Sequence, residues 1–284
     1  MIKKVILIGG GSVALNIAKY LKLKSIELHY LENKSDFALS NEEMCRTLNI
    51  SFSCLSKDEI TEYFLKQNEK TLVISASNRY LFPADVIAKS NLEIINFHGS
   101  LLPDYPGRNA EAWTIFDLSK YAGITWHSVV DKVDKGDILI QKKFKLSEKH
   151  TSFSLLRANL KLAYDSFLEI ENQLFSGTYK LYKQGKGKNT KFNFAKDIPN
   201  NGYLDFNWTG DKISAFLRAM DYGPLKILGA PKISFNDLDY TIEKYSITNE
   251  VKNSNEKIIL DGDILFITKP QKKITLKICR IHER

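Results

Sequence analysis

The first 145 residues alternate between short apolar runs and stretches with helical periodicity, and this alternation restricts the fold more than any other feature. Residues 5–8 form an apolar, β-branched-rich run, which is typical of a parallel strand covered on both faces. Further runs at residues 26–31, 71–76 and 92–97 predict three more strands. The residues between 13 and 21 carry an apolar stripe at helical spacing. We therefore expect an α/β fold, with a Rossmann-like twisted, mostly parallel sheet and helices on both faces.

Local signals place the helices between these strands. Ser40 and Ser56 each precede a glutamate by three residues, a capping-box pattern that predicts a helix after each serine. Pro83 is suited to begin another helix. Residues 151–175 form one long amphipathic pattern, and we expect Gly177 to end it.

The remainder of the chain differs in pattern, which predicts a second domain. We expect a catalytic domain over residues 1–180, a linker over 181–202 and a small β-rich C-terminal domain over 203–284. The linker holds several lysines between 183 and 196, and such a run of like charge usually stays solvated. Within the last domain we expect a helix at 211–220, then strands at 258–267 and 273–281 with a turn near Pro270.

Composition limits the class of protein. The 284 residues carry a formal net charge of +8, but only seven of the 41 basic residues are Arg, the residue that nucleic-acid sites favour. A lysine surplus scattered along the chain is weak support for a nucleic-acid partner. The three cysteines show no C-x-x-C spacing, so neither a disulfide framework nor a metal site is indicated. No apolar run is long enough to cross a membrane or to act as a signal peptide, and we expect a cytoplasmic protein.

A glycine-rich loop follows the first predicted strand. Gly9, Gly10, Gly11 and Ser12 stand where backbone N–H groups can hold an anion. The pattern is close to a dinucleotide fingerprint, with Glu32 about twenty residues further on as its acidic partner. The same glycines can also serve a plain chain reversal, so both interpretations stay open.

The clearest chemical signal lies between residues 95 and 139. Asn96 and His98 end an apolar strand two residues apart, so both side chains lie on one face at the carboxyl edge of the sheet. Asp134 follows in a glycine-containing turn. A histidine, an amide and a carboxylate could move a proton, donate to a developing oxyanion and orient the histidine.

The ordered motif N-x-H-x-S-L-L-P-x-Y-x-G, then G-x-T-x-H, then D-x-G-D-I-L resembles the catalytic core of the folate-dependent formyltransferases. That superfamily includes enzymes that formylate glycinamide ribonucleotide, methionyl-tRNA, amino sugars and amines in peptide assembly. The resemblance is good over residues 1–176 and looser beyond. It implies transfer of a formyl group from 10-formyltetrahydrofolate to a primary amine, with Asn96, His98 and Asp134 as the catalytic set and no metal.

The resemblance also implies binding residues. The backbone around Arg79, Tyr80 and Leu81 would hold the folate pterin, and the loop with Val130, Asp131 and Val133 would form the other wall of that pocket. The amine substrate would meet a group of residues at two loops and the second histidine, namely Gly10, Gly11, Ser12, Arg108, Asn109 and His127.

Departures from the family pattern leave the amine acceptor open. Gly99 replaces the proline of several relatives, and the stretch after Gly107 differs in the region that faces the amine. Trp126 and the segment 201–205 resemble peptide-assembly relatives. We favour a small-molecule amine, either a nucleotide-linked amino sugar or an amino-acid amine, free or carrier-bound. Methionyl-tRNA is the alternative, a homodimer is left open, and a catalytically silent folate or nucleotide binder is the hypothesis from another class.

Overall fold

The computed structural model describes the chain except for residues 1, 25, 35–39, 250–254 and 282–284. Contacts divide it into two compact units, each built from several segments of sequence. We call the unit of residues 1–107, 123–143 and 158–191 the α/β unit. The unit of residues 108–122, 144–157 and 192–284 is called the β-sheet unit. The expected linear boundaries at residues 180 and 203 stay a prediction.

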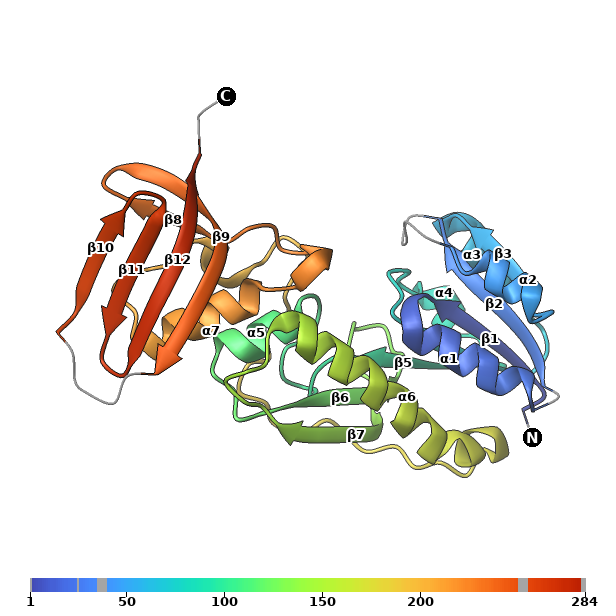
Figure 1. Ribbon diagram of the computed structural model, residues 1–284. Coiled ribbons are helices and arrows are strands. Elements are labelled where there is room, and N and C mark those ends of the chain that lie inside the picture. Colours follow the sequence, from blue (N-terminus) through green and yellow to red (C-terminus); the bar gives the residue numbers. More distant parts are fainter. Residues whose placement is uncertain (1, 25, 35–39, 250–254, 282–284) are drawn as a thin grey trace. The chain divides into compact units, whose positions relative to one another are not determined.

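The α/β unit carries most of a seven-stranded sheet, whose order is β3-β2-β1-β4-β5-β6-β7 (Figure 1). The pairings from β3 through β5 are parallel, and β6 runs antiparallel to β5. This confirms the predicted Rossmann-like, mostly parallel sheet. The strands are β1 (Lys4–Gly9), β2 (Glu27–Asn33), β3 (Ser51–Leu55), β4 (Thr71–Ala76), β5 (Leu92–His98), β6 (Tyr121–Ser128) and β7 (Ile138–Lys145).

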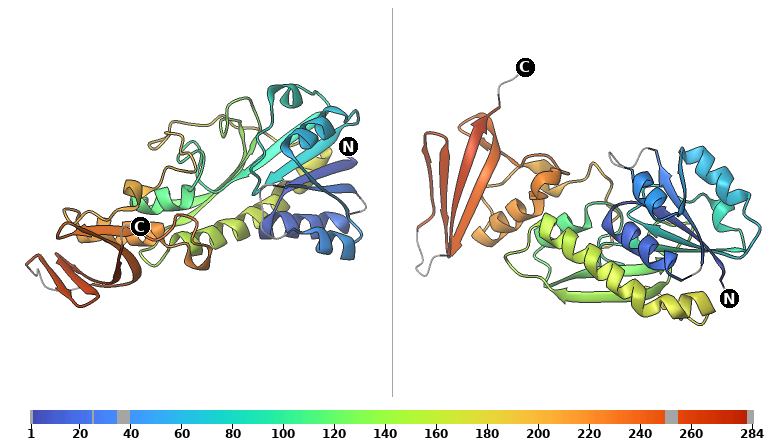
Figure 2. Two further views of the ribbon diagram at one scale, coloured as in Figure 1. Left: turned by 90° about the horizontal axis from the view of Figure 1, so that it is seen from above. Right: turned by 45° about the vertical axis from the view of Figure 1, so that its right-hand side comes forward.

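Helices cover both faces of this sheet. Successive side chains of β1 point to opposite faces, and they are apolar on both, so each face packs against helices. Val5 and Leu7 belong to an apolar cluster with α1 and α6, whereas Ile6 and Ile8 pack with α3 and α4. Figure 2 shows α6 as one long helix beside the sheet. The helices are α1 (Gly11–Lys22), α2 (Glu42–Thr47), α3 (Lys57–Leu65), α4 (Ala84–Ile87) and α6 (Ser152–Ser176).

The two predicted capping boxes have different outcomes. At Ser56 the box forms: its side chain accepts from the Glu59 N–H, and the Glu59 carboxylate accepts from the Ser56 N–H. After Ser40 the predicted helix forms as α2, but the capping box does not, because Asn41 is the N-cap and its side chain makes no capping bond. The Ser40 hydroxyl donates to the buried Glu32 carboxylate at 2.6 Å and accepts from the Glu42 N–H at 3.1 Å. It thus binds the first turn of α2 and a buried charge together.

The β-sheet unit has its own core beneath a five-stranded antiparallel sheet of order β10-β11-β12-β9-β8. Helix α7 (Gly210–Met220) supplies Ile213, Phe216 and Leu217 to this core. The unit also holds α5 (Ala110–Phe116) and two short 3-10 helices, Pro199–Gly202 and Gly223–Leu225. The strands are β8 (Lys232–Phe235), β9 (Leu238–Asn249), β10 (Lys257–Asp261), β11 (Ile264–Lys269) and β12 (Lys272–Arg280).

One predicted strand of this unit is wrong. The run at 258–267 is a hairpin of β10 and β11 rather than one strand. Asp261 pairs with Ile264, which leaves Gly262 and Asp263 as a two-residue loop, and Gly262 has a φ of 60°. Glycine adopts this left-handed conformation without a steric penalty, so the chain reverses there. The turn expected near Pro270 is confirmed between β11 and β12.

Candidate active site

Four polar side chains meet at the end of β5. Asn96 and His98 come from β5, His127 from β6, and Asp134 from the loop between β6 and β7. The antiparallel register places Asn96 opposite His127 and His98 opposite Thr125. Asn96 Nδ2 lies 3.1 Å from His127 Nε2, so the amide and the ring are in hydrogen-bond contact. The structure thus brings together the three residues predicted as catalytic and His127.

Asp134 connects the two histidines. Its Oδ2 lies 3.5 Å from His98 Nδ1, and its Oδ1 lies 3.6 Å from His127 Nε2. The Gly107 N–H donates to Oδ2 at 2.7 Å. Burial alone would raise the pKa of this carboxyl, but the charge of His98, the His127 ring and the Gly107 N–H hold it well below its ordinary value. Asp134 is therefore a carboxylate at neutral pH, although only 7% of its surface is exposed.

Each histidine ring lies between a backbone carbonyl and Asp134. His98 Nε2 lies 2.9 Å from the Tyr105 carbonyl, and its Nδ1 faces Asp134. His127 Nδ1 lies 2.8 Å from the Ser128 carbonyl, and its Nε2 faces both the Asn96 amide and Asp134. A ring N–H can donate to a carbonyl or a carboxylate oxygen. Both rings are therefore oriented by a backbone carbonyl on one side and by the same carboxylate on the other.

Polar residues on β4 and just after it orient the Asn96 amide. The Ser75 hydroxyl donates to Asn96 Oδ1 at 2.8 Å, and Asn78 Nδ2 donates to the Ser75 oxygen at 3.3 Å. With its oxygen held in this way, the amide directs Nδ2 to the Phe97 carbonyl and to His127. The sequence analysis did not single out Ser75 or Asn78. The sequence signal that could have indicated them is their position at the carboxyl end of β4, the strand that pairs with β5.

A close approach of two backbones shapes the Asp134 loop. A Cβ at Gly136 would lie 1.7 Å from the Ser128 carbonyl oxygen, so only glycine permits this return of the loop onto the end of β6. Asp134 itself has a φ of 57°, in the left-handed region. The glycine of the D-x-G-D motif therefore has a structural reason, because it lets the loop pass close to the end of β6.

The lysine-containing segment 182–191, which we call the strap, binds both loops of the site. Gln184 Nε2 donates to the carbonyls of Asp134 and Gly136, each at 2.8 Å. The Asp104 carboxylate accepts from the N–H groups of Lys188 and Asn189 at 2.6 and 2.8 Å. The lysine side chains are exposed, as expected for a solvated run. The strap is nevertheless held to the loops around residues 104 and 134. The charge pattern of the sequence did not predict these contacts.

The residues expected at the folate have different environments. Tyr80 is buried, its hydroxyl bonds to Thr61, and its backbone N–H and carbonyl are both bound by Asn78. Leu81 is 61% exposed. Across the site, Val130 and Val133 are each about 40% exposed and Asp131 is exposed. Arg79 follows Asn78 in the same loop. The apolar side chains left open are therefore those of Leu81, Val130 and Val133.

The residues expected at the amine belong to different elements of the chain. Gly10, Gly11 and Ser12 stand at the start of α1, and a Cβ at Gly9 would lie 1.8 Å from the Ala76 carbonyl oxygen. The chain reversal therefore needs glycine at residue 9 whether or not the loop binds a ligand. Glu32, the acidic residue of the dinucleotide interpretation, is bound instead by Ser40 and Asn41.

Arg108 and Asn109 belong to the β-sheet unit. The Arg108 N–H donates to the Asn193 carbonyl, and the Asn109 amide donates to the carbonyls of Ala195 and Asp197. The Asn109 side chain therefore holds the following segment of its own unit. Trp126, which suggested peptide-assembly relatives, is fully buried between Phe97 and Phe167 and serves the core.

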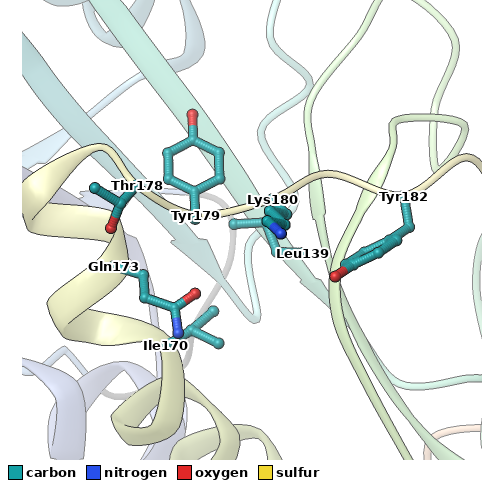
Figure 3. Close-up of a pocket in the computed structure, with 7 residues that line it drawn as sticks. All are labelled: Leu139, Ile170, Gln173, Thr178, Tyr179, Lys180 and Tyr182. Atoms are coloured by element: carbon teal, nitrogen blue, oxygen red, sulfur yellow. The ribbon is translucent and has the colours of Figure 1, made fainter.

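A cavity of about 500 Å³ lies between the end of α6 and the start of the strap (Figure 3). Asn96, His98 and Asp134 do not line it. Its walls are Leu139, Ile170, Gln173, Thr178, Tyr179, Lys180 and Tyr182.

Within the described residues, no helix is long and apolar enough to cross a membrane. The same part of the chain holds no cluster of three or more His, Cys, Asp or Glu side chains that could bind a metal ion.

Comparison with known proteins identifies the family. The family model described as "Formyl transferase" matches residues 11–170. A GDP-perosamine N-formyltransferase of Brucella melitensis is 29% identical over 182 residues, which are 64% of this chain and 69% of the relative. A methionyl-tRNA formyltransferase of Lachnospira eligens is 27% identical over 60% of this chain and 53% of its own length.

Among solved structures, an N-formyltransferase from Helicobacter canadensis in complex with folinic acid and dTDP-3-aminofucose has the same fold. Its TM-score is 0.77 at 20% sequence identity, over 98% of this chain and all of that one. The family match covers more than half of the chain and includes Asn96, His98, His127 and Asp134. The chain therefore belongs to the formyl transferase family.

Proposed function

We propose that this protein transfers the formyl group of 10-formyltetrahydrofolate to the primary amine of a nucleotide-linked amino sugar. The observation that carries the proposal is the contact of Asp134 with His98 and His127, together with the Asn96 amide. An acyl transfer to an amine needs a donor for the developing oxyanion and an acceptor for the amine proton. This group of side chains contains both.

In the proposed mechanism, the neutral amine attacks the formyl carbon and negative charge develops on the formyl oxygen. The Asn96 amide and the protonated His98 ring are the hydrogen-bond donors for that oxygen. His98 Nε2 lies 2.9 Å from the Tyr105 carbonyl, so donation to the formyl oxygen requires the ring to exchange this partner. Asp134 keeps His98 charged and accepts the amine proton, directly or through water. The carbon–nitrogen bond to the folate then breaks and the folate nitrogen is protonated.

The folate itself would lie against the exposed apolar side chains of Leu81, Val130 and Val133. These residues fit a flat ring because they are open, apolar and flank the loops that follow β4 and β6. The donor supplies the formyl group, and the protein's part is to bind and orient it beside Asn96 and His98. The roles of Arg79, Tyr80 and Asp131 are part of the same proposal.

An amino sugar on a nucleotide is favoured over other amines by the relatives. The Brucella relative formylates GDP-perosamine by its name, and the Helicobacter structure contains dTDP-3-aminofucose. The exposed lysines of residues 183–196 suit a substrate with a diphosphate, because a positive surface raises the local concentration of an anion. Methionyl-tRNA is the second candidate, which the Lachnospira relative represents.

A panel of acceptors tests the proposal. The full chain is incubated with 10-formyltetrahydrofolate and, separately, with nucleotide-linked amino sugars, free amino acids and methionyl-tRNA. We expect a formylated nucleotide sugar, detected by mass spectrometry, with an affinity that depends on salt less steeply than the binding of a tRNA would. Formylation of methionyl-tRNA alone, with a steep salt dependence from phosphate contacts, would reject the sugar acceptor.

A further inference from the structure

Within the described part of the chain, one edge of the C-terminal sheet has no partner strand. β10 and β8 are its two outer strands, and Figure 1 shows β10 at the far side of the sheet from β9. The edge of β8 is covered, because Tyr203 bridges to Lys232 and the Leu204 N–H donates to the Lys232 carbonyl at 2.8 Å. For β10, the described residues provide a partner strand on one side only, which is β11.

The backbone of β10 presents hydrogen-bonding groups to this edge. Asp261 and Ile264 close a two-residue hairpin, and such a closing pair exchanges its hydrogen bonds across the two strands. Backbone groups alternate in direction along a strand, so those of Asp261, Ile259 and Lys257 point toward β11. The N–H and carbonyl groups of Ile258 and Leu260 therefore point to the open side.

The side chains along this edge are apolar on both faces. Ile258 and Leu260 are each 37% exposed and lie on the side of the buried residues of β11, whereas Ile259, opposite Phe266, is 53% exposed. Monomeric proteins commonly protect such edges with central charges, prolines or bulges. Here the charged residues stand only at the two ends of the strand, and the three residues between them are apolar.

We propose that β10 pairs with β10 of a second copy of this chain, antiparallel and about a twofold axis at Ile259. This register places Ile258 opposite Leu260 of the second copy, so the outward backbone groups of both strands meet. Ile259 faces its own equivalent. Lys257 lies opposite Asp261 of the second copy, and the same ion pair occurs twice by symmetry.

The strand sequence Lys-Ile-Ile-Leu-Asp thus complements itself in charge, apolar character and backbone direction at one register. A one-residue shift in either direction would align inward-pointing with outward-pointing backbone groups and remove both ion pairs. This self-complementarity identifies a second copy of the chain as the partner that pairs with the edge of β10. Five residues a side bury less than the ~800 Å² per partner of a stable interface, so the dimer forms in a concentration-dependent way.

Proline at residue 260 tests the backbone part of the proposal. Because the Leu260 N–H faces the open edge, L260P leaves the bonds to β11 intact and removes one outward donor from each copy. Sedimentation equilibrium of the full chain over a concentration series should show a wild-type dimer and a dissociation constant at least about 30-fold weaker for L260P. Circular dichroism and the thermal midpoint check that the variant is folded.

Charge reversal tests the register without touching the backbone. D261K places lysine opposite lysine at both symmetric contacts and should weaken the dimer about 10-fold. The double variant K257D/D261K exchanges the two charges, and it should return to within about threefold of wild type. A nonspecific apolar contact or another register would not show this rescue.

A wild-type chain that stays monomeric up to millimolar concentration would overturn the proposal. So would a dimer that neither L260P nor D261K weakens, because its interface would then lie elsewhere. Failure of the double variant to restore what D261K loses would reject the proposed register and, with it, the twofold pairing. These measurements do not depend on formyl transfer, so their outcome is separate from that of the proposed function.

Discussion

Each of the two units buries a charged side chain, and the two charges are used in different ways. In the β-sheet unit, the Lys272 ammonium has a partner for each of its donors: Glu148 at 2.7 Å, the Asn249 side chain at 2.8 Å and Asp211 at 3.5 Å. In the α/β unit, Asp134 has one short bond, from the Gly107 N–H, and two longer contacts to histidine rings.

Burial alone therefore does not identify a side chain that takes part in chemistry. The partners of Lys272 are groups whose charge does not change near neutral pH, so its contacts act as a tie between segments. The partners of Asp134 are two rings that can gain or lose a proton in that range. Contacts of 3.5 and 3.6 Å also leave room for partners to be exchanged. We therefore expect changes at Asp134 to affect catalysis and changes at Lys272 to affect stability.

The largest expected effect follows from removing the Asp134 charge. D134N keeps the shape of the side chain but loses the carboxylate that holds His98 charged and accepts the amine proton. We expect kcat/KM for formyl transfer to fall about 10³-fold. The matched control is D137N in the same loop, since Asp137 is paired with the exposed Lys183 and should be dispensable. Equal activity of D134N and wild type would reject the proposed role.

Lys272 should show the opposite result. K272M removes the charge that joins Glu148, Asp211 and Asn249 and leaves two carboxylates that are already more than half exposed. We expect the free energy of unfolding to fall by about 2 kcal/mol, measured by urea denaturation. The kcat of the folded enzyme should not change. A large loss of kcat with unchanged stability would remove the contrast between the two charges.

Gln184 tests whether the strap positions Asp134. Q184L keeps the approximate size of the side chain and removes both donors to the carbonyls of Asp134 and Gly136. We expect kcat to fall about 10-fold with little change in KM for the acceptor, because the loop geometry and not the binding surface is altered. The adjacent variant K183A removes one exposed charge of the strap and serves as the control for kcat, which should stay at the wild-type value. A stability loss without any change in kcat would make Gln184 purely structural.

The smallest effect concerns the pH dependence of stability. The pKa of Asp134 is lower in the folded chain than its ordinary value of 3.8, so the unfolded state binds more protons below about pH 4. The stabilisation from this carboxylate is present above that pH and is lost as the pH falls. Urea denaturation of wild type and D134N from pH 7 to pH 3 should show the two free energies converging with acidity. Parallel curves would contradict the lowered pKa.

Most of the α/β fold and the chemical centre could be predicted from sequence. Asn96 and His98 share a face because strand residues alternate, and the spacing of the motif led to Asp134. Ser75, Asn78 and Gln184 escaped prediction because single polar residues have no pattern of their own. Their importance follows from what they contact. The strand predicted at 258–267 failed because its apolar pattern continues across a two-residue turn.

Local sequence patterns specify the alternation of strands and helices, the glycine turns and the identity of the groups at the site. These are local properties, set by side-chain periodicity and backbone sterics over a few residues. Tertiary contacts are needed to establish that β6 runs antiparallel to β5 and that the strap holds the loop of Asp134. They are also needed to establish that, among the described residues, β10 has a partner strand on one side only. Each of these depends on contacts between residues far apart in sequence. Such contacts form where packing and hydrogen bonding are satisfied together, which a local pattern does not encode.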